Sequence, residues 1–140
     1  MIPTELQHAI LTRIKKVAIF DTLQMEVVAF AEGYCEISVP RHPNYDGVYD
    51  SFHGGILMTI ADSVACLAIF TKTGPEQLMT TTDMNIRFLA PCLSAVRAKA
   101  HVIKFGKTLC PVAVDLYDAA NKPVAVAQVT YMLLNKMPRR

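Results

Sequence analysis

The chain of 140 residues has the length of one domain, and its hydrophobic content of 52% is enough to build a buried core. With 14 basic and 12 acidic residues, its formal net charge of +2 argues against a nucleic-acid-binding protein, which would need a clustered basic face. We therefore expect a single domain over residues 1–140 that binds no nucleic acid.

The chain begins with a predicted helix and two predicted strands. An amphipathic N-terminal helix is expected within residues 1–20, because apolar side chains recur there at helical spacing (Leu6, Ile10, Ile14 and Val17). Residues 23–31 and 34–39 are rich in β-branched and apolar residues, and Glu32-Gly33 between them is typical of a hairpin turn. These segments predict an antiparallel pair of strands.

A loop and a strongly apolar helix follow. Residues 40–52 are rich in Pro, Asn, Asp, Gly and Ser, which predicts a loop. Residues 54–70 are apolar on every side of a helix, which indicates a helix surrounded by protein. A membrane span is not expected, because Asp62 in the middle of this stretch would cost on the order of 2.5–3.5 kcal/mol in a bilayer.

Four more strands are predicted after this helix, at residues 81–89, 96–102, 109–117 and 124–134. Residues 135–140 are expected to form a flexible tail. Alternation in the first strand puts apolar side chains on one face and a polar set on the other (Thr81, Asp83, Asn85 and Arg87). The element order predicts an α+β fold in which a curved, mainly antiparallel sheet wraps around the central helix. One curved sheet cannot enclose a helix completely, so we expect a homodimer whose second subunit completes the burial.

Asp62 is the only charged residue within the apolar stretch 54–70. Burial removes much of the hydration of a carboxylate, so this side chain needs hydrogen-bond partners or a water-filled cleft. It could be a structural Asp satisfied by a backbone amide or an Arg, or it could be a tuned base or nucleophile. Helical periodicity alone does not decide between these two interpretations.

His53-Gly54-Gly55 stands at the start of the same helix. The first amide groups of a helix lack intrahelical acceptors, and glycine lets a ligand approach them closely. Such a site could hold a carbonyl oxygen and stabilise the negative charge that develops on it. The simpler alternatives are a helix entry turn for the glycines and a capping or core role for His53.

The sequence from His53-Gly54-Gly55 through six residues to Asp62 resembles the signature of hotdog-fold acyl-CoA thioesterases, specifically the PaaI-like (phenylacetate-degradation) subgroup. The resemblance continues in TTDMNIRFLAP at 81–91 and KFGKT at 104–108. It implies a hotdog fold and hydrolysis of an aliphatic or aryl acyl-CoA to free acid and coenzyme A. It also implies a homodimer or homotetramer with sites at the subunit interface. Because coenzyme A is part of the substrate, no cofactor is implied.

The resemblance also implies catalytic roles. Asp62 would be the general base or the nucleophile, and the amide of Gly54 or Gly55 would donate to the thioester carbonyl. Thr81 would orient the attacking water, and His53 would orient the site or support the thioester. The sequence leaves open whether Asp62 attacks directly or activates water.

Contacts with coenzyme A are implied for Asn85, Arg87 and the turn Gly106-Lys107. Ordinary solvated charges on strands and turns are an equally good interpretation of the basic residues among them. We expect no metal ligands in this chain.

Gly47 departs from the family pattern. Related enzymes usually place an Asn or Gln six residues before the His, where it polarises the carbonyl or holds the nucleophile. Asn44, Asp46 or Asp50 could take that role if the loop is shaped differently. Loss of one such donor can cost on the order of 10²–10³ in rate. The main alternative function is therefore a non-catalytic acyl-CoA-binding protein, and a hotdog hydratase or dehydratase is a weaker third.

The four cysteines are far apart in sequence and form no C-x-x-C pair, so we expect free thiols rather than a metal or redox site (Cys35, Cys66, Cys92 and Cys110). Residues 1–20 show no secretory signal pattern. Together these features predict a cytoplasmic protein that is not bound to a membrane.

Overall fold

The computed structural model describes residues 1–135, so all of the predicted tail except Asn135 lies outside the described residues. The helices are α1 (Thr4–Ile14), α2 (Ala18–Thr22) and α3 (Gly54–Thr73), with a 3-10 turn, η1, at Pro43–Tyr45. The strands are β1 (Glu26–Ala31), β2 (Tyr34–Val39), β3 (Leu78–Phe88), β4 (Val96–Val102), β5 (Leu109–Tyr117) and β6 (Pro123–Leu134).

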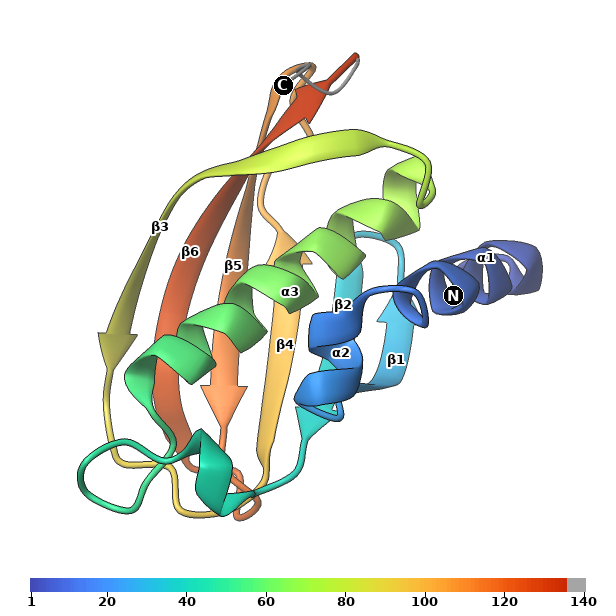
Figure 1. The fold of residues 1–140 in the computed structure, drawn as a ribbon. Helices are drawn as coiled ribbons and strands as arrows, with labels where there is room; N and C mark the ends of the chain where they lie inside the picture. The colour runs from blue at the N-terminus through green and yellow to red at the C-terminus, as the bar shows by residue number, and fades with distance from the viewer. Residues whose placement is uncertain (136–140) are drawn as a thin grey trace, which may run out of the picture.

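The six strands form one antiparallel sheet in the order β1-β2-β4-β5-β6-β3. The sheet curves around α3, which crosses its concave face diagonally (Figure 1). This confirms the α+β arrangement expected from the sequence. Strands β1 and β3 are the two edges of the sheet, and β3 follows directly after α3 in the chain.

The core lies between α3 and the concave face of the sheet. Alternating side chains of β2 are fully buried there (Cys35, Ile37 and Val39), as are those along α3 (Ile60, Val64 and Ile69). Helix α3 is long and apolar enough to cross a membrane by composition alone. Packing inside the sheet accounts for that apolar character without a bilayer. The helix ends at Gly74, whose φ of 84° is a conformation that favours glycine.

The single helix expected within residues 1–20 is divided into α1 and α2. The backbone turns between them, because the amides of Lys16 and Val17 donate to carbonyls three residues earlier instead of four. Leu23 and Met25 are buried, but they follow α2 in a turn, with Gln24 at a φ of 53°. The predicted strand over 23–31 therefore begins only at Glu26.

Strand β3 contains a β-bulge that the alternation pattern does not predict. Thr81 pairs with Tyr131 of β6 and Asp83 pairs with Thr130, which leaves Thr82 as the extra residue. The bulge reverses the alternation, so Thr81 faces α3 while Asp83 lies on the other face. The expectation that these two side chains share a face is wrong.

Candidate active site

Asp62 is held by two hydroxyl groups from the sheet. Thr81 Oγ1 donates to Asp62 Oδ1 at 2.8 Å, and the phenolic oxygen of Tyr131 lies 2.8 Å from the same atom. The Tyr131 oxygen also lies 2.8 Å from the backbone carbonyl oxygen of Asp62. The structure therefore brings together the two predicted residues Asp62 and Thr81 and adds Tyr131, which sequence reasoning missed.

The two titratable groups beside Asp62 remain protonated at neutral pH. Burial raises the pKa of the Tyr131 phenol, and the neighbouring Cys66 and Asp62 raise it further. Burial also raises the pKa of the Cys66 thiol to about 12, with a smaller contribution from Asp62. Tyr131 is thus a hydrogen-bond donor at neutral pH, and Cys66 is an uncharged thiol.

A cavity of about 520 Å³ begins at this cluster and runs toward the N-terminal helices. Asp62, Thr81 and Tyr131 line it, and its other walls are mostly apolar (Ile14, Val17, Phe20, Cys66, Leu67, Phe70 and Met79). A few convergent polar groups in an apolar cleft are typical of a site for a small ligand. A larger hollow of about 690 Å³ lies between α1, α2 and β1, but none of the predicted catalytic residues lines it.

His53, Gly54 and Gly55 are placed at the N-terminus of α3. Nδ1 of His53 accepts from the Gly55 amide at 2.8 Å, so the imidazole caps the helix, as the simpler interpretation expects. The carbonyl of His53 accepts from the amides of Ile56 and Leu57. Among the described residues, no group accepts from the Gly54 amide. Gly54 is therefore the residue of the pair whose N–H is available to a ligand.

The aromatic ring of Phe88 covers the Gly54 backbone. A Cβ atom at Gly54 would lie 3.1 Å from the nearest ring atom, so the absence of a side chain permits this close approach. Phe88 is 52% exposed although it is a large apolar residue. A shallow hollow of about 410 Å³ surrounds these two residues at the helix N-terminus.

The two groups of candidate residues are too far apart to act together within one chain. Gly54 and Asp62 are eight residues apart on α3, which corresponds to about 12 Å along the helix axis. The carbonyl carbon of a substrate must lie within about 3 Å of the attacking group, and its oxygen must lie within about 3 Å of the oxyanion donor. Within one chain, therefore, a single carbonyl group cannot contact both Asp62 and the Gly54 amide.

Gly47 lies beside His53 in the loop before α3. A Cβ atom at this position would lie 3.6 Å from His53, and the Gly47 amide donates to the Ser51 carbonyl at 2.9 Å. Asp46 is one of the residues that could replace the Asn or Gln that related enzymes have at the position of Gly47. Its side chain forms an ion pair with Arg41. Arg41 also donates to the Asp50 carbonyl at 2.8 Å, so this cation holds the loop closed.

The residues predicted to contact coenzyme A lie outside the cavity. Asn85 and Arg87 are exposed and pair with Gln128 and Val126, on the face of the sheet that points away from α3. Gly106 and Lys107 lie in the connection between β4 and β5. A Cβ atom at Gly106 would lie 2.4 Å from the Leu109 carbonyl oxygen, so the turn requires glycine.

Sequence reasoning missed Tyr131 and the part of the cavity formed by α1 and α2. Tyr131 occupies an ordinary inward position of β6, where aromatic core residues are common, so its sequence context gives no functional signal. The apolar face of α1 packs on the core through the buried Ile10, and this packing also leaves Arg13 and Ile14 lining the cavity.

Comparison with known proteins gives a consistent result. Residues 49–125, more than half of the chain, match the family described as the thioesterase superfamily. Acyl-coenzyme A thioesterase 13 of Homo sapiens is 34% identical over 106 residues, which cover 72% of this chain and 72% of that protein. The E. coli PaaI protein from the phenylacetic acid degradation operon superposes with a TM-score of 0.88 at 17% identity, covering 98% of this chain and 99% of the other.

A thioesterase of Haemophilus influenzae superposes with a TM-score of 0.83 at 23% identity, covering 93% of this chain and 92% of that chain. These structural likenesses confirm the fold that the sequence resemblance implies.

Proposed function

The chain belongs to the thioesterase superfamily, and from this premise we propose that it hydrolyses acyl-coenzyme A at sites shared between two subunits. The observation that carries the proposal is the hydrogen-bonded carboxylate of Asp62 at one end of an apolar cavity. A carboxylate in this position can act on a thioester whose acyl group occupies the cavity.

The reaction needs a base or nucleophile and a donor for the oxyanion. In the water route, Asp62 accepts a proton from water, and the oxygen of that water bonds to the thioester carbon. The carbonyl oxygen becomes negative and accepts a hydrogen bond from the Gly54 amide. Collapse of this intermediate breaks the C–S bond, and the coenzyme A thiolate takes up the proton. In the direct route, an Asp62 oxygen bonds to the thioester carbon, and the C–S bond breaks to release the coenzyme A thiolate and leave an anhydride. Water then hydrolyses the anhydride, which releases the free acid, restores the Asp62 carboxylate and supplies the proton that the thiolate takes up.

A two-fold dimer would bring the two halves of the site together. Strand β3 is an edge of the sheet with 11 residues and an unpaired side, which is a ready surface for a second copy. Antiparallel pairing of two β3 strands would also make the two α3 helices antiparallel. The N-terminus of α3 from one subunit would then approach the middle of α3 from the other, where Asp62 lies.

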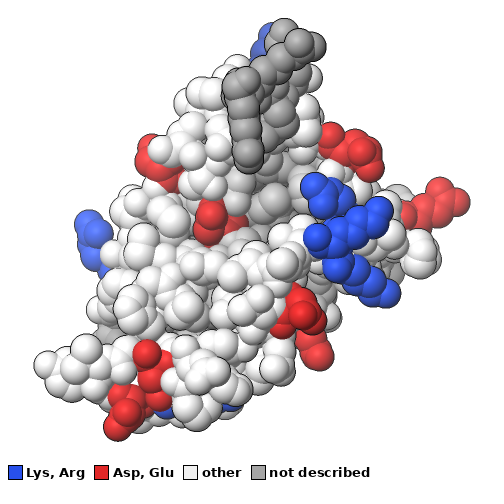
Figure 2. Space-filling view, in the orientation of Figure 1, with Lys and Arg blue, Asp and Glu red and all other residues white. Residues whose placement is uncertain are grey.

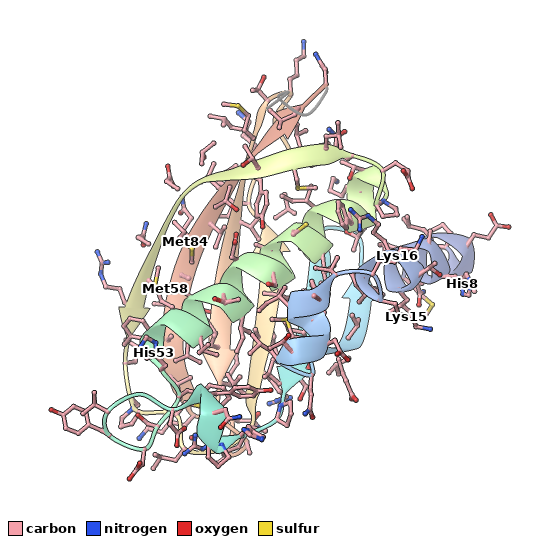
Figure 3. All side chains as sticks on the ribbon, viewed as in Figure 1. His8, Lys15, Lys16, His53, Met58 and Met84 are labelled. Carbon is pink, nitrogen blue, oxygen red and sulfur yellow. The ribbon has the colours of Figure 1, made fainter. Side chains whose placement is uncertain are left out.

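The surface beside β3 fits such an interface. Met58 of α3, Met84 of β3 and His53 lie on the same side of the molecule, along the seam between the two elements (Figure 3). This face carries few charges, whereas Lys and Arg side chains gather at the end of α1 near Lys15 and Lys16 (Figure 2). Depletion of charge and enrichment of Met are typical of the centre of a protein interface.

We propose that the cavity receives the acyl group. Its mostly apolar walls favour an aliphatic or aryl chain, and residues of α1 and α2 line the part away from Asp62. For the coenzyme A portion, Asn85, Arg87 and the turn Gly106-Lys107 remain the proposed contacts. The described cysteines are all free, which fits the proposed cytoplasmic location.

The test is release of free thiol from a panel of short, long and aromatic acyl-CoA thioesters. We expect turnover by the wild-type protein and a loss of about 10²–10⁴-fold in kcat for Asp62→Asn. Asp83→Asn is the matched control, because Asp83 is an exposed Asp on β3 that lies on the face of the sheet away from α3. Full activity in a folded Asp62→Asn protein would contradict the mechanism. Tight acyl-CoA binding by calorimetry without turnover of any thioester would favour the non-catalytic alternative raised by Gly47.

A further inference from the structure

Tyr131 is one of the most buried polar side chains next to the cavity. It is 6% exposed, and its position on β6 directly opposite Thr81 on β3 sets both hydroxyls toward Asp62. Both hydroxyl oxygens lie 2.8 Å from Asp62 Oδ1. Two neighbouring strands therefore hold one carboxylate oxygen, and the Tyr131 hydroxyl shares its single proton between that oxygen and the Asp62 backbone carbonyl oxygen.

The other carboxylate oxygen is left free. Among residues 1–135, no group donates to Asp62 Oδ2, and this atom is not one of the buried side-chain oxygens without a partner. Asp62 lines the cavity, so the unbonded oxygen is the one that a ligand or a water there can reach. We propose that Tyr131 is a positioning residue that, with Thr81, fixes Asp62 Oδ1 and thereby presents Oδ2 as the reacting oxygen.

The physical reason for a positioning role is the freedom of a carboxylate. Its terminal torsion is broad, so an Asp with one hydrogen bond can rotate and exchange its two oxygens. A second donor on the same oxygen opposes that rotation, and reaction rates fall steeply when an attacking atom is misplaced by about 1 Å. Tyr131 acts through Asp62 in this scheme and needs no contact with the thioester.

The inference rests on the proposed function, because a reacting oxygen implies a reaction. Its test is Tyr131→Phe, which removes only the hydroxyl. We expect kcat to fall about 10–100-fold, as for other groups that orient a catalytic residue, while KM changes less than about twofold. A purely structural role would not separate kcat from KM in this way.

The matched control is Tyr45→Phe. Tyr45 is also 6% exposed, and its hydroxyl donates to the Thr22 carbonyl at 2.9 Å, away from the cavity. Both variants remove one buried phenolic hydroxyl, so both should lower the unfolding midpoint in urea. Only Tyr131→Phe should lose kcat. Equal kcat values in the two variants would overturn the inference.

A double variant tests whether the two hydroxyls act as a unit. Thr81 and Tyr131 hold the same oxygen, so their substitutions should not act independently. We expect Thr81→Val to change kcat by one factor in the wild type and by a different factor in Tyr131→Phe. Strictly multiplicative effects would mean that the hydroxyls act independently, and the shared positioning role would be wrong.

Crystal structures of the wild type and Tyr131→Phe separate this inference from the proposed function. We expect the Asp62 carboxylate to rotate by more than about 30° or to occupy two orientations in the variant. An unchanged carboxylate would overturn the positioning role even if the wild type were active. If no thioester is hydrolysed, the function fails, and the structures still decide whether Tyr131 orients Asp62.

Discussion

The middle and the N-terminus of α3 carry the two halves of the proposed site, and they are built in opposite ways. Around Asp62 the surroundings are mostly buried, and two hydroxyls fix one carboxylate oxygen. At the N-terminus the His53 side chain is exposed, and the Gly54 amide has no acceptor among the described residues. In one half the sheet holds a carboxylate by one of its oxygens, and in the other a backbone N–H has no acceptor among the described residues.

This difference follows from what each half must do. A carboxylate taken out of water needs hydrogen bonds to remain in place, so its partners are part of the fold. A donor for an oxyanion must stay unpaired until the substrate arrives, which is tolerable only where solvent can reach it. Under the proposed function, the distance between the two halves along one helix is the reason for expecting a second subunit to complete each site.

After the loss of Asp62 itself, the largest expected effect comes from removing the Gly54 N–H. Gly54→Pro deletes this single donor, and proline is well tolerated at the first residue of a helix. His53, with φ of −59° and ψ of 133°, already has the extended conformation that a following proline requires. We expect kcat for thiol release to fall about 10²–10³-fold.

Gly54→Ala is the control for that change. Its Cβ meets the same Phe88 ring at 3.1 Å, but it keeps the amide N–H. We expect the alanine variant to retain most of its activity and the proline variant to lose it. Similar losses in both variants would assign the effect to crowding of Phe88 and would remove Gly54 from the oxyanion site.

The next effect is recovery of activity when two inactive variants are mixed. In a hybrid dimer of Asp62→Asn and Gly54→Pro, one site combines an intact Asp62 with an intact Gly54 amide from the other subunit. Random exchange makes half of the dimers hybrids with one of two sites intact, so about a quarter of the wild-type rate should return.

This complementation is measured by thiol release after the two proteins are partly unfolded together and refolded. Each variant treated alone is the control and should stay inactive. No recovery, with hybrid dimers demonstrated by native mass spectrometry, would place both groups of a site in one subunit and contradict the shared site.

The smallest expected effect concerns the Cys66 thiol at high pH. Cys66 has a pKa of about 12 in the folded chain, above its ordinary value of 9.0. The unfolded chain therefore releases this proton first, and rising pH above about 9 favours unfolding. Stability conferred by the neutral thiol is fully present below pH 9 and is lost as the pH rises toward 12.

Urea unfolding at pH 8 and pH 10 checks this prediction. We expect the wild type to lose about 1 kcal/mol more than Cys66→Ala over that interval. The change in the free energy of unfolding between the two pH values is taken within each protein. Any effect of Cys66→Ala on stability that does not depend on pH therefore cancels. An equal loss in both proteins would mean that the surroundings of Cys66 are wetter than the structure indicates.

Much of the fold was predictable because it depends on local patterns. The alternation of Cys35, Ile37 and Val39 predicts β2 with its buried face, and the uniformly apolar stretch around Asp62 predicts a central helix. The division of the N-terminal helix was not predictable, because residues around Val17 have ordinary helical patterning. Docking on the core decides where that helix turns.

The candidate site was predictable only in part. Asp62 stands out as a charge among apolar residues, and the glycines after His53 are visible as a motif. Tyr131 is not visible, because it lies 69 residues from Asp62 and has the pattern of a core side chain. Hydrogen bonds between distant segments have no signature in a single sequence.

The sequence by itself determined the strands, the buried helix and the position of the carboxylate on it, because burial imposes periods of 2 and 3.6 residues that can be counted. Only the tertiary structure decided that Thr81 faces Asp62. The bulge at Thr82 arises from the register between β3 and β6, which depends on the pairing of two strands rather than on the residues of either one. The same pairing places Tyr131 opposite Thr81 and so completes the support of the carboxylate.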